Sequence, residues 1–382
     1  MTGTASDSGT NASTDTASEN LDSLDWSGWS MDGGGPGHAR AATWTTGPDG
    51  KPSVAWSFEP EWDADTVDAS EPAVVDGTVY AGLTRRDAAG SGDITGGTVV
   101  ALDAADGSTQ WEYYHDCGGI GTPAVVDGSV YVGTTDGQVH ALDATNGKPL
   151  WKQEVASDTP ASRVTVADDT VYVSGDSTYA LDAASGQVRW ETDALVRPSL
   201  WDGSLFGYRS LGEGEYSLVA VDAAAGAELW SVTLSGAGTV LAPPAVRGGT
   251  VVALVEGADE THAFDAADGT RRWEDAGDGP VLPAVDQERV YGAYTYGPPV
   301  HAHDAETGEE GWSTEKVVVN SLAVAGGTVY VTREPSGSEP VLEALGATSG
   351  AERWRLTGQS GEIAVADGGI YLAGDDGITA LQ

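Results

Sequence analysis

The chain has 382 residues, and its 59 aspartate and glutamate residues outnumber the 18 lysine and arginine residues, giving a formal net charge of −41. Nucleic acids and anionic lipid surfaces are bound through basic patches, and no basic run here exceeds two residues, so neither is expected as a partner. The single cysteine, Cys117, excludes an internal disulfide and a cysteine-rich metal site.

The N-terminal segment differs in composition from the rest of the chain. Residues 1–24 are rich in serine and threonine, which predicts a disordered tether. No apolar stretch is long enough for a signal-peptide core or a transmembrane helix, so direct membrane insertion is not expected. Because such tethers commonly join a membrane anchor to an exported domain, we expect an extracytoplasmic protein. Lipid anchoring through a removed N-terminal signal and a cytoplasmic location both stay open.

From residue 101 onward, the chain repeats one eleven-residue pattern seven times, and each copy ends in tryptophan. ALDAADGSTQW at 101–111 and ALDATNGKPLW at 141–151 are two of the copies. The terminal tryptophans recur every 39 to 43 residues, which is the length of one four-stranded propeller blade. The repeat therefore predicts an all-β protein, a β-propeller of four-stranded antiparallel blades.

Residues 122–151 show the structural logic of one repeat most clearly. Its four predicted strands, from innermost to outermost, are 124–126, 130–133, 139–142 and 149–151. Asp-Gly or Asn-Gly pairs, which favour hairpin turns, separate these runs. In the last turn, Asp143 can accept hydrogen bonds from the backbone amides just ahead of it. Gly147 can adopt the positive φ that most residues avoid.

The tryptophan that ends each repeat adds a large apolar surface to the outermost strand. It is placed to pack on the neighbouring blade and to fix the spacing between blades. An eighth tryptophan stands in the same position within residues 51–59. The predicted structural docking residues are Trp56, Trp111, Trp151, Trp190, Trp230, Trp273, Trp312 and Trp354.

The number of blades follows from the two ends of the repeat array. Residues 355–382 supply only three strands of a last blade, and residues 51–59 have the character of the missing outermost strand. An N-terminal strand that completes the C-terminal blade closes the ring and removes exposed sheet edges. We predict eight blades in a single domain over residues 25–382, with 25–50 as a lead-in and 51–59 as the closing strand. Seven blades is the alternative.

The insertions between repeats gather on one face of the predicted propeller. We define the loop face as the side that carries the connections between blades and those between second and third strands. It receives the insertions at 58–71, 84–97, 209–216, 256–260, 294–299 and 333–340. Loops on a rigid scaffold often build binding surfaces, which aromatic and arginine side chains anchor. The predicted partner-binding residues are Trp62, Arg85, Arg86, Tyr294 and Tyr296. The alternative is that these loops are only solvated.

The best copy of the repeat, AHDAETGEEGW at 302–312, resembles the tryptophan-docking repeat of quinoprotein-type propellers. Residues 44–382 are similar to cofactor-free members of this PQQ-like repeat family, which include the bacterial outer-membrane assembly lipoprotein. Residues 25–44 resemble the tryptophan- and glycine-rich lead-in of these relatives, and we expect them to lie against the propeller surface. Gly346 replaces the aspartate of the repeat, so a looser turn is expected there.

The resemblance also bears on cofactors and catalysis. Quinoprotein dehydrogenases of the family are longer and carry a vicinal cysteine pair by the cofactor. This chain lacks that pair, so no cofactor is expected. His115, Asp116 and Cys117 precede an innermost strand and are expected near the channel mouth, but their spacing alone does not establish a nucleophile and base.

His301 and His303 look like a two-ligand metal strand, because alternate residues of a strand share one face. When the repeats are aligned, however, apolar residues such as Leu142 and Leu181 occupy the position of His303. We therefore interpret His303 as a packed strand residue and assign no metal ligands.

Two functions remain after these considerations. The first is a non-catalytic, monomeric scaffold whose loop face binds a protein partner or the cell surface. The second is a small quinoprotein-like or other ligand-binding oxidoreductase that uses the channel mouth. The missing cysteine pair and the lack of a convergent catalytic set favour the scaffold, so no catalytic or cofactor-binding residues are assigned.

The net charge of −41 also indicates the environment. In molar salt the Debye length shrinks to about 3 Å, so the mutual repulsion of surface carboxylates becomes tolerable. Only four of the 18 basic residues are lysine. The composition is typical of a halophilic protein of the archaeal type, and an acidic protein from an ordinary environment is the alternative.

Overall fold

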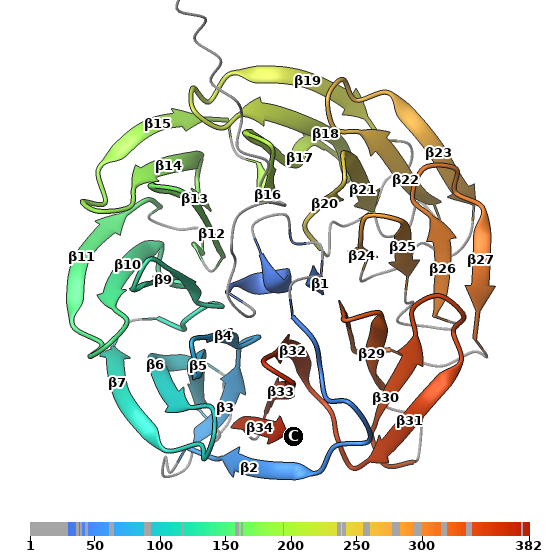
Figure 1. The fold of residues 1–382 in the computed structure, drawn as a ribbon. Coiled ribbons are helices and arrows are strands. Elements are labelled where there is room, and N and C mark those ends of the chain that lie inside the picture. The colour runs from blue at the N-terminus through green and yellow to red at the C-terminus, as the bar shows by residue number, and fades with distance from the viewer. Residues whose placement is uncertain are drawn as a thin grey trace, which may run out of the picture.

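The computed structural model describes residues 30–35, 38, 40–42, 45–60, 65–87, 93–116, 118–156, 160, 161, 163–193, 195–234, 238, 242–254, 260–276, 283–292, 300–314, 319–333, 338–375 and 377–382. These residues form eight antiparallel blades around a central channel (Figure 1). The prediction of eight blades is confirmed, and the alternative of seven is wrong. The predicted tether at 1–24 lies outside the described residues. Within the described part of the chain, no helix is long and apolar enough to cross a membrane.

The strands of each blade run in order from the channel to the rim. Blade 1 contains β3 (Asp65–Ala69), β4 (Ala73–Val75), β5 (Thr78–Asp87), β6 (Ile94–Asp103) and β7 (Thr109–His115); blade 2 contains β8 (Ala124–Val126), β9 (Ser129–Gly133), β10 (Gln138–Asp143) and β11 (Pro149–Glu154); blade 3 contains β12 (Val164–Ala167), β13 (Thr170–Ser174), β14 (Thr178–Asp182) and β15 (Val188–Thr192); blade 4 contains β16 (Val196–Trp201), β17 (Ser204–Gly212), β18 (Glu215–Asp222) and β19 (Glu228–Thr233). Blade 5 contains β20 (Ala245–Arg247), β21 (Thr250–Leu254), β22 (Glu260–Asp265) and β23 (Arg271–Ala276); blade 6 contains β24 (Ala284–Val285), β25 (Arg289–Gly292), β26 (His301–Asp304) and β27 (Glu310–Ser313); blade 7 contains β28 (Ser321–Ala325), β29 (Thr328–Arg333), β30 (Val341–Gly346) and β31 (Glu352–Thr357); blade 8 contains β32 (Glu362–Ala366), β33 (Gly369–Gly374), β34 (Gly377–Leu381) and β2 (Val54–Phe58).

The inner and outer strands of a blade differ in burial. In β9, the consecutive residues Val130, Tyr131 and Val132 are all buried, because neighbouring blades cover both faces of the sheet. In β11, at the rim, exposed residues alternate with half-buried ones. The apolar runs of the inner strands and the alternation of the outermost strand therefore reflect the packing of each blade between its neighbours.

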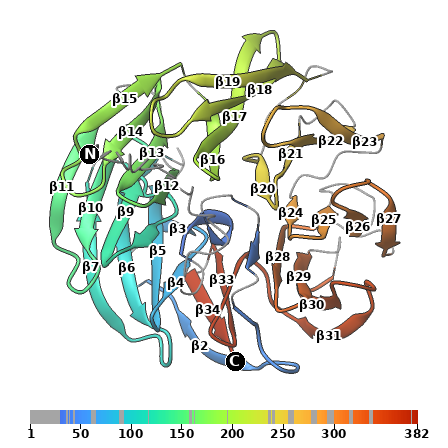
Figure 2. The same cartoon turned by 45° about the horizontal axis from the view of Figure 1, so that its top comes forward.

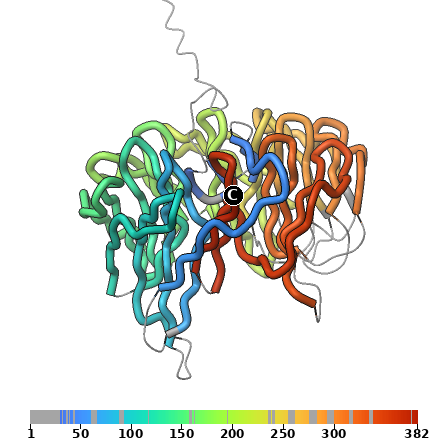
Figure 3. The backbone as a smooth tube through the Cα atoms, turned by 60° about the horizontal axis from the view of Figure 1, so that its bottom comes forward, coloured from blue at the N-terminus to red at the C-terminus, as the bar shows by residue number. Residues whose placement is uncertain are grey.

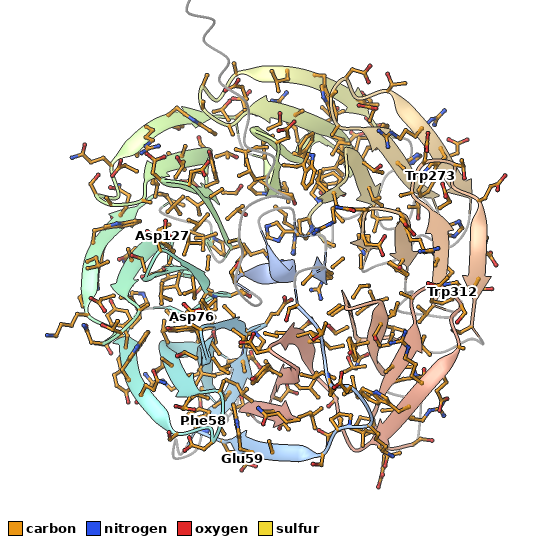
Figure 4. All side chains as sticks on the ribbon, in the orientation of Figure 1. Phe58, Glu59, Asp76, Asp127, Trp273 and Trp312 are labelled. Atoms are coloured by element: carbon orange, nitrogen blue, oxygen red, sulfur yellow. The ribbon has the colours of Figure 1, made fainter. Side chains whose placement is uncertain are left out.

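The turn between the first and second strands is the hairpin turn that Asp-Gly predicts. Asp127 and Gly128 have φ values of 49° and 73°, and a type I′ turn requires positive φ at both central residues. Asp76 and Gly77 repeat this geometry in blade 1, and Asp76 and Asp127 mark the two turns in Figure 4. Short turns of this kind keep the face opposite the loop face compact.

The turn between the third and fourth strands is held by the repeat aspartate. Asp143 Oδ1 accepts from the amide of Thr145 at 2.8 Å, and the amide of Gly147 donates to the carbonyl of Asp143 at 2.8 Å. In blade 7, where Gly346 replaces the aspartate, the amide of Gly350 still donates to the Gly346 carbonyl at 2.8 Å. The expectation of a looser turn is therefore wrong for the backbone, and only the side-chain cap is lost.

Seven of the eight repeat tryptophans dock on the turn of the following blade. Trp111 Nε1 donates to the Ala144 carbonyl at 2.8 Å, and its ring lies against Gly147. An added Cβ on Gly147 would stand 2.5 Å from Trp111 Cε3. The other docking sets are Trp56 with Ala104 and Gly107, Trp151 with Ala183 and Gly186, Trp190 with Ala223 and Gly226, Trp230 with Ala266 and Gly269, Trp273 with Ala305 and Gly308, and Trp312 with Ala347 and Gly350. Figure 4 shows Trp273 and Trp312 on neighbouring blades near the rim.

The ring closes through the N-terminal strand β2. This strand pairs antiparallel with β34 (Figure 2), with Phe58 opposite Ile378 and Val54 opposite Leu381. Beyond the strand ends, Ser53 and Gln382 exchange two backbone hydrogen bonds of 2.9 and 3.0 Å. The strand therefore supplies backbone partners along the outer side of β34, as the closure prediction required.

The described part of the lead-in lies inside the channel rather than against the propeller surface, which corrects the sequence-based expectation. The short 3₁₀ helix η2 (Asp32–Gly34) and β1 (Ala41–Ala42) occupy the centre of the ring (Figure 1, Figure 2). β1 adds to β28 as a parallel strand, with Ala41 opposite Val324. Met31, Ala41 and Ala42 are buried, each in a different apolar cluster, so burial of apolar surface favours this central position.

Polar contacts tie the lead-in to several blades at once. They join Ser30 O to Val125 N in blade 2 at 2.8 Å, Gly33 N to Glu71 Oε1 in blade 1 at 2.8 Å, His38 Nε2 to Thr165 Oγ1 in blade 3 at 2.9 Å, and Ala41 O to Arg247 Nη1 in blade 5 at 3.0 Å. Beyond β1, the carbonyl of Thr46 accepts from Gly368 in blade 8 at 2.9 Å. The lead-in therefore passes through the channel before it reaches the closing strand.

The docking interaction gives a direct test at the repeat glycine. Gly147→Ala is expected to lower the free energy of unfolding by about 3 kcal/mol, because it adds a clash with Trp111 to the cost of a left-handed backbone. Gly128→Ala is the matched control: its φ is 73°, but no atom lies within 4 Å of the added Cβ. The control should lose only about 1 kcal/mol. Urea unfolding in high salt measures both, and equal losses would contradict the docking role.

Closure by β2 predicts a second result. Deleting residues 44–58 is expected to abolish the cooperative thermal unfolding transition in high salt, because it leaves the outer side of β34 without its backbone partner. Deleting residues 2–24, within the predicted tether, is the control and should leave the transition in place. A melting curve that survives loss of 44–58 unchanged would rule out this form of closure.

Candidate functional site

The loop face carries long hairpins on blades 1 and 4. In blade 1, β5 and β6 have ten residues each, compared with five in β9. β3 lines the outer half of β5, from Asp65 opposite Asp87 to Ala69 opposite Leu83. This three-stranded extension projects from the face of the ring (Figure 3). In blade 4, β17 and β18 stay paired as far as Gly212 opposite Glu215.

Two of the predicted partner-binding residues stand on the blade 1 hairpin. Arg85 and Arg86 lie near the end of β5 and are both half-buried. Arg86 forms an ion pair with Asp68 of β3, which fixes the hairpin to its neighbouring strand. Tyr114, at the end of β7, is 55% exposed. Trp62, Tyr294 and Tyr296 lie outside the described residues, so the grouping of the full predicted set stays a prediction.

His115 is the last residue of β7, the rim strand of blade 1. Its position in the sequence, before an innermost strand, predicts a place near the channel mouth, and the structure does not place it there. The chain turns inward only after this residue. Its Nε2 lies 3.0 and 3.1 Å from the two carboxylate oxygens of Asp136, in the turn between β9 and β10 of blade 2. His115 is 7% exposed. Asp116 is exposed beside it, and Cys117 lies outside the described residues.

A chain of hydrogen bonds leads from Asp136 to a second buried histidine. A carboxylate only accepts, so the Gln138 amide nitrogen must donate to Asp136 Oδ2 at 3.1 Å, and Gln138 Oε1 must accept from His140 Nε2 at 3.1 Å. His140 Nδ1 is then the acceptor for the Tyr113 hydroxyl at 3.1 Å. The contact with Gln138 thus requires a proton on His140 Nε2, and Nδ1 accepts from Tyr113 when the ring is neutral.

The electrostatics of this network follow from burial and neighbouring groups. Burial, and after it the positive charge of Lys152, lower the pKa of His140 from 6.5 to about 4. Burial raises the pKa of the Asp136 carboxyl, but hydrogen bonds from Thr134 and His115 outweigh it and leave that pKa below its ordinary value. At neutral pH the network therefore pairs an ionised carboxylate with a neutral His140.

This hydrogen-bond network is best explained as a structural contact that joins blades 1 and 2. Tyr113 and His115 come from β7 of blade 1, whereas Gln138 and His140 come from β10 of blade 2 and Asp136 from the turn before it. Nothing in the sequence indicates this role for Asp136, because Asp136-Gly137 matches the pattern of a hairpin turn. The alternation of Gln138 and His140 along one strand was the available clue.

The histidines of blade 6 are packed into the structure. His303 stacks on Trp273 with ring centroids 6.1 Å apart and an interplanar angle of 20°, and its Nδ1 lies 3.0 Å from the Gly308 carbonyl. His301 and His303 meet edge to face at 4.7 Å. Within the residues that the structure describes, no group of three or more histidine, cysteine, aspartate or glutamate side chains could hold a metal ion.

The low pKa of His140 predicts an acid-sensitive step in stability. Above pH 6.5 neither the folded nor the unfolded chain carries a proton on His140. As the pH falls towards 4, the unfolded chain gains that proton while the folded chain stays neutral. The free energy of unfolding should therefore fall by about 3 kcal/mol from this residue alone.

His140→Val tests this step, because Val100 and Val219 occupy the same register position in other blades. The variant is expected to lose less stability than the wild type between pH 7 and pH 4. Because the carboxylates that also titrate in this range are common to both proteins, the difference isolates His140. Parallel pH profiles for the two proteins would contradict the assignment.

Comparison with known proteins agrees with the fold. A family model described as outer membrane protein assembly factor BamB matches residues 95–200, 193–297 and 297–382. The outer membrane protein assembly factor BamB of Yersinia pestis is 28% identical over 259 residues, which cover 59% of this chain and 63% of that protein. The quinohemoprotein alcohol dehydrogenase of Comamonas testosteroni is 25% identical over 289 residues, covering 69% of this chain and 37% of that protein.

A solved structure extends the likeness to most of the ring. The crystal structure of BamB from Moraxella catarrhalis superposes with a TM-score of 0.62 and 19% identity, covering 86% of this chain and 97% of that chain. By sequence, the chain spans less than two thirds of the length of the Yersinia and Comamonas relatives. Because the family model matches residues 95 to 382 without a gap, which is more than half of the chain, the chain belongs to the PQQ-like repeat family described as outer membrane protein assembly factor BamB.

Proposed function

We propose that this protein is a non-catalytic scaffold whose loop face binds a protein partner. The observation that carries the proposal is a division of the molecule: η2 and β1 of the lead-in lie at the centre of the ring, whereas the loop face carries long hairpins. Binding surfaces on rigid scaffolds are commonly built from such loops. Membership in a family described as an assembly factor supports the same conclusion.

The hairpins also offer side chains suited to protein contacts. Leu211, near the tip of the blade 4 hairpin, is 50% exposed, and Tyr114, at the foot of the blade 1 hairpin, is 55% exposed. Arg85 and Arg86 stand half-buried on the blade 1 hairpin, with Arg86 paired to Asp68. Exposed aromatic, aliphatic and arginine side chains commonly anchor protein interfaces.

The alternative is a quinoprotein-like or other ligand-binding oxidoreductase, and the Comamonas relative is the observation in its favour. The residues present do not fit that cofactor. Cys117 is the only cysteine, so the vicinal pair of the quinoprotein dehydrogenases cannot form. In addition, η2 and β1 occupy the centre of the ring, where a channel ligand would need space.

We further propose that the protein works outside the cytoplasm in high salt and acts as a monomer in its complex. The formal charge of −41 is compatible with a compact fold where salt screens carboxylate repulsion. In the described part of the chain, at least nine of the 18 basic residues form ion pairs with the chain's own carboxylates: Arg40, Arg86, Arg189, Arg209, Arg271, Arg272, Arg289, Arg333 and Arg355. The excess surface charge is therefore almost entirely negative.

Affinity capture in molar salt from the protein's own cells tests the scaffold. The tagged wild type is expected to retain a stoichiometric protein partner, identified by mass spectrometry. Replacing residues 84–97 with a short turn should reduce the recovered partner at least about tenfold, the loss expected when an interface anchor is removed. The matched control is Lys148→Ala on the opposite face, which should leave recovery unchanged.

The same samples distinguish the oxidoreductase. Small molecules extracted from the purified protein, and activity with an artificial electron acceptor, report on a bound cofactor. A bound quinone with activity and no protein partner would establish the alternative. A partner that is retained equally by both variants would place the interface away from the blade 1 hairpin.

A further inference from the structure

The guanidinium of Arg40 lies at the centre of the ring among groups from three blades. Its Nη2 is 3.1 Å from Glu71 Oε2 and 3.5 Å from Glu362 Oε2. Its Nη1 donates to Ser321 Oγ at 3.4 Å and to the Leu322 carbonyl at 3.5 Å. The side chains of Arg40 and Glu71 are only 11% and 3% exposed. The lead-in thus places one cation where blades 1, 7 and 8 meet.

Two of the receiving groups, Ser321 and Glu362, are held by contacts within the propeller itself. Ser321 Oγ donates to Glu362 Oε2 at 3.0 Å and lies 3.2 Å from the amide of Ile363, which donates to it. These contacts join blade 7 to blade 8 without Arg40. Glu71 precedes β4 in blade 1, and a carboxylate buried this deeply is costly unless a cation faces it. The body of the ring therefore presents Ser321 and Glu362 already bonded to each other, and the Glu71 carboxylate beside them accepts from Gly33 N of the lead-in through its other oxygen.

The shape of this set selects a guanidinium group over an ammonium group. Two carboxylates face one nitrogen, while a hydroxyl and a carbonyl face the other. A planar fork with several fixed donors can serve both directions at once, whereas a lysine ammonium is a single compact point charge. The acceptors thus match the chemistry of an arginine side chain.

The backbone of the lead-in is bent to bring Arg40 there. Arg40 and His38 have φ values of 46° and 45°, in the left-handed region that non-glycine residues seldom adopt. Such conformations persist where surrounding contacts over-determine them. His38 is held by Thr165, and Arg40 by the acceptors of blades 1, 7 and 8.

We propose that Glu71, Glu362, Ser321 and the Leu322 carbonyl form a guanidinium-binding site, and that Arg40 is its tethered ligand. In the intact protein the site is filled from within, which locks the lead-in into the channel. When Arg40 is removed, the site takes a free guanidinium compound. This inference is independent of the proposed scaffold function, because it concerns the channel and not the loop face.

Chemical rescue tests the site. Arg40→Ala removes the guanidinium and is expected to lower the thermal midpoint, because it leaves the buried Glu71 carboxylate without its cation. Millimolar methylguanidinium chloride, added at constant total salt, should raise the midpoint of this variant saturably by about 2 °C, since a ligand that binds only the folded state stabilises it. Methylammonium chloride at the same concentration should have much less effect.

Two further variants control the experiment. Arg271→Ala removes an arginine from an exposed ion pair with Glu274, whose side chains are 53% and 48% exposed, and should show no specific response to methylguanidinium. Arg40→Ala combined with Glu71→Gln removes the buried carboxylate and should lose the rescue. If Arg40→Ala does not fold alone, the readout becomes the folded fraction recovered in each cation, which must be larger with methylguanidinium.

The possible results of the rescue experiment distinguish a guanidinium-binding site from an ordinary ion pair. A saturable rescue that is specific for methylguanidinium and lost with Glu71→Gln supports the site. Equal responses to the two cations, no response, or the same response in Arg271→Ala would overturn it and leave Arg40 as an ordinary ion pair. None of these results depends on capture of a partner, so failure here leaves the scaffold proposal standing.

Discussion

The joint between one blade's tryptophan and the next blade's turn is the interaction on which the ring depends. Three features meet there: an indole N–H that needs a buried acceptor, a carbonyl at a fixed place in the turn, and a glycine that leaves room for the ring. Trp111, Ala144 and Gly147 show all three. The glycine adopts a positive φ, and its lack of a Cβ lets the indole ring pack directly against the backbone. The joint therefore fixes both the distance and the angle between neighbouring blades.

The lead-in complements these rim joints from the inside. The tryptophan joints lie towards the outer strands, whereas Met31, Ala41 and Arg40 contact the innermost strands. The same N-terminal region then passes from the channel to the rim as β2 and pairs with β34. One continuous stretch thus stabilises the ring at its axis and at its seam, which couples the burial of the lead-in to the closure of the last blade.

The fold could be predicted from the sequence because the tryptophan-containing pattern repeats at a regular spacing. Seven spaced tryptophans and the Asp-Gly turns predicted the blades, and the incomplete last repeat predicted closure by residues 51–59. The predicted position of the lead-in was wrong because its contacts are long-range and not repeated. Nothing local in residues 30–42 indicates that Arg40 contacts Glu71 and Glu362. The site residues were harder for the same reason. Asp136 fits the turn pattern perfectly well, so its bond to His115 could emerge only when blades 1 and 2 were brought together.

The docking joints also run in one direction around the ring, and this has an evolutionary consequence. Blades 1 to 6 each carry a tryptophan that docks on the next blade and a turn that receives the tryptophan of the preceding blade, as blade 2 does with Trp151 and Gly147. A duplicated unit of this kind contains both the docking tryptophan and the receiving turn, so it can form a joint with the blade on either side. Blade 8 takes its outermost strand, β2, from before the repeat array and its other three strands from the end of the array, so copying this blade requires two separate stretches of gene.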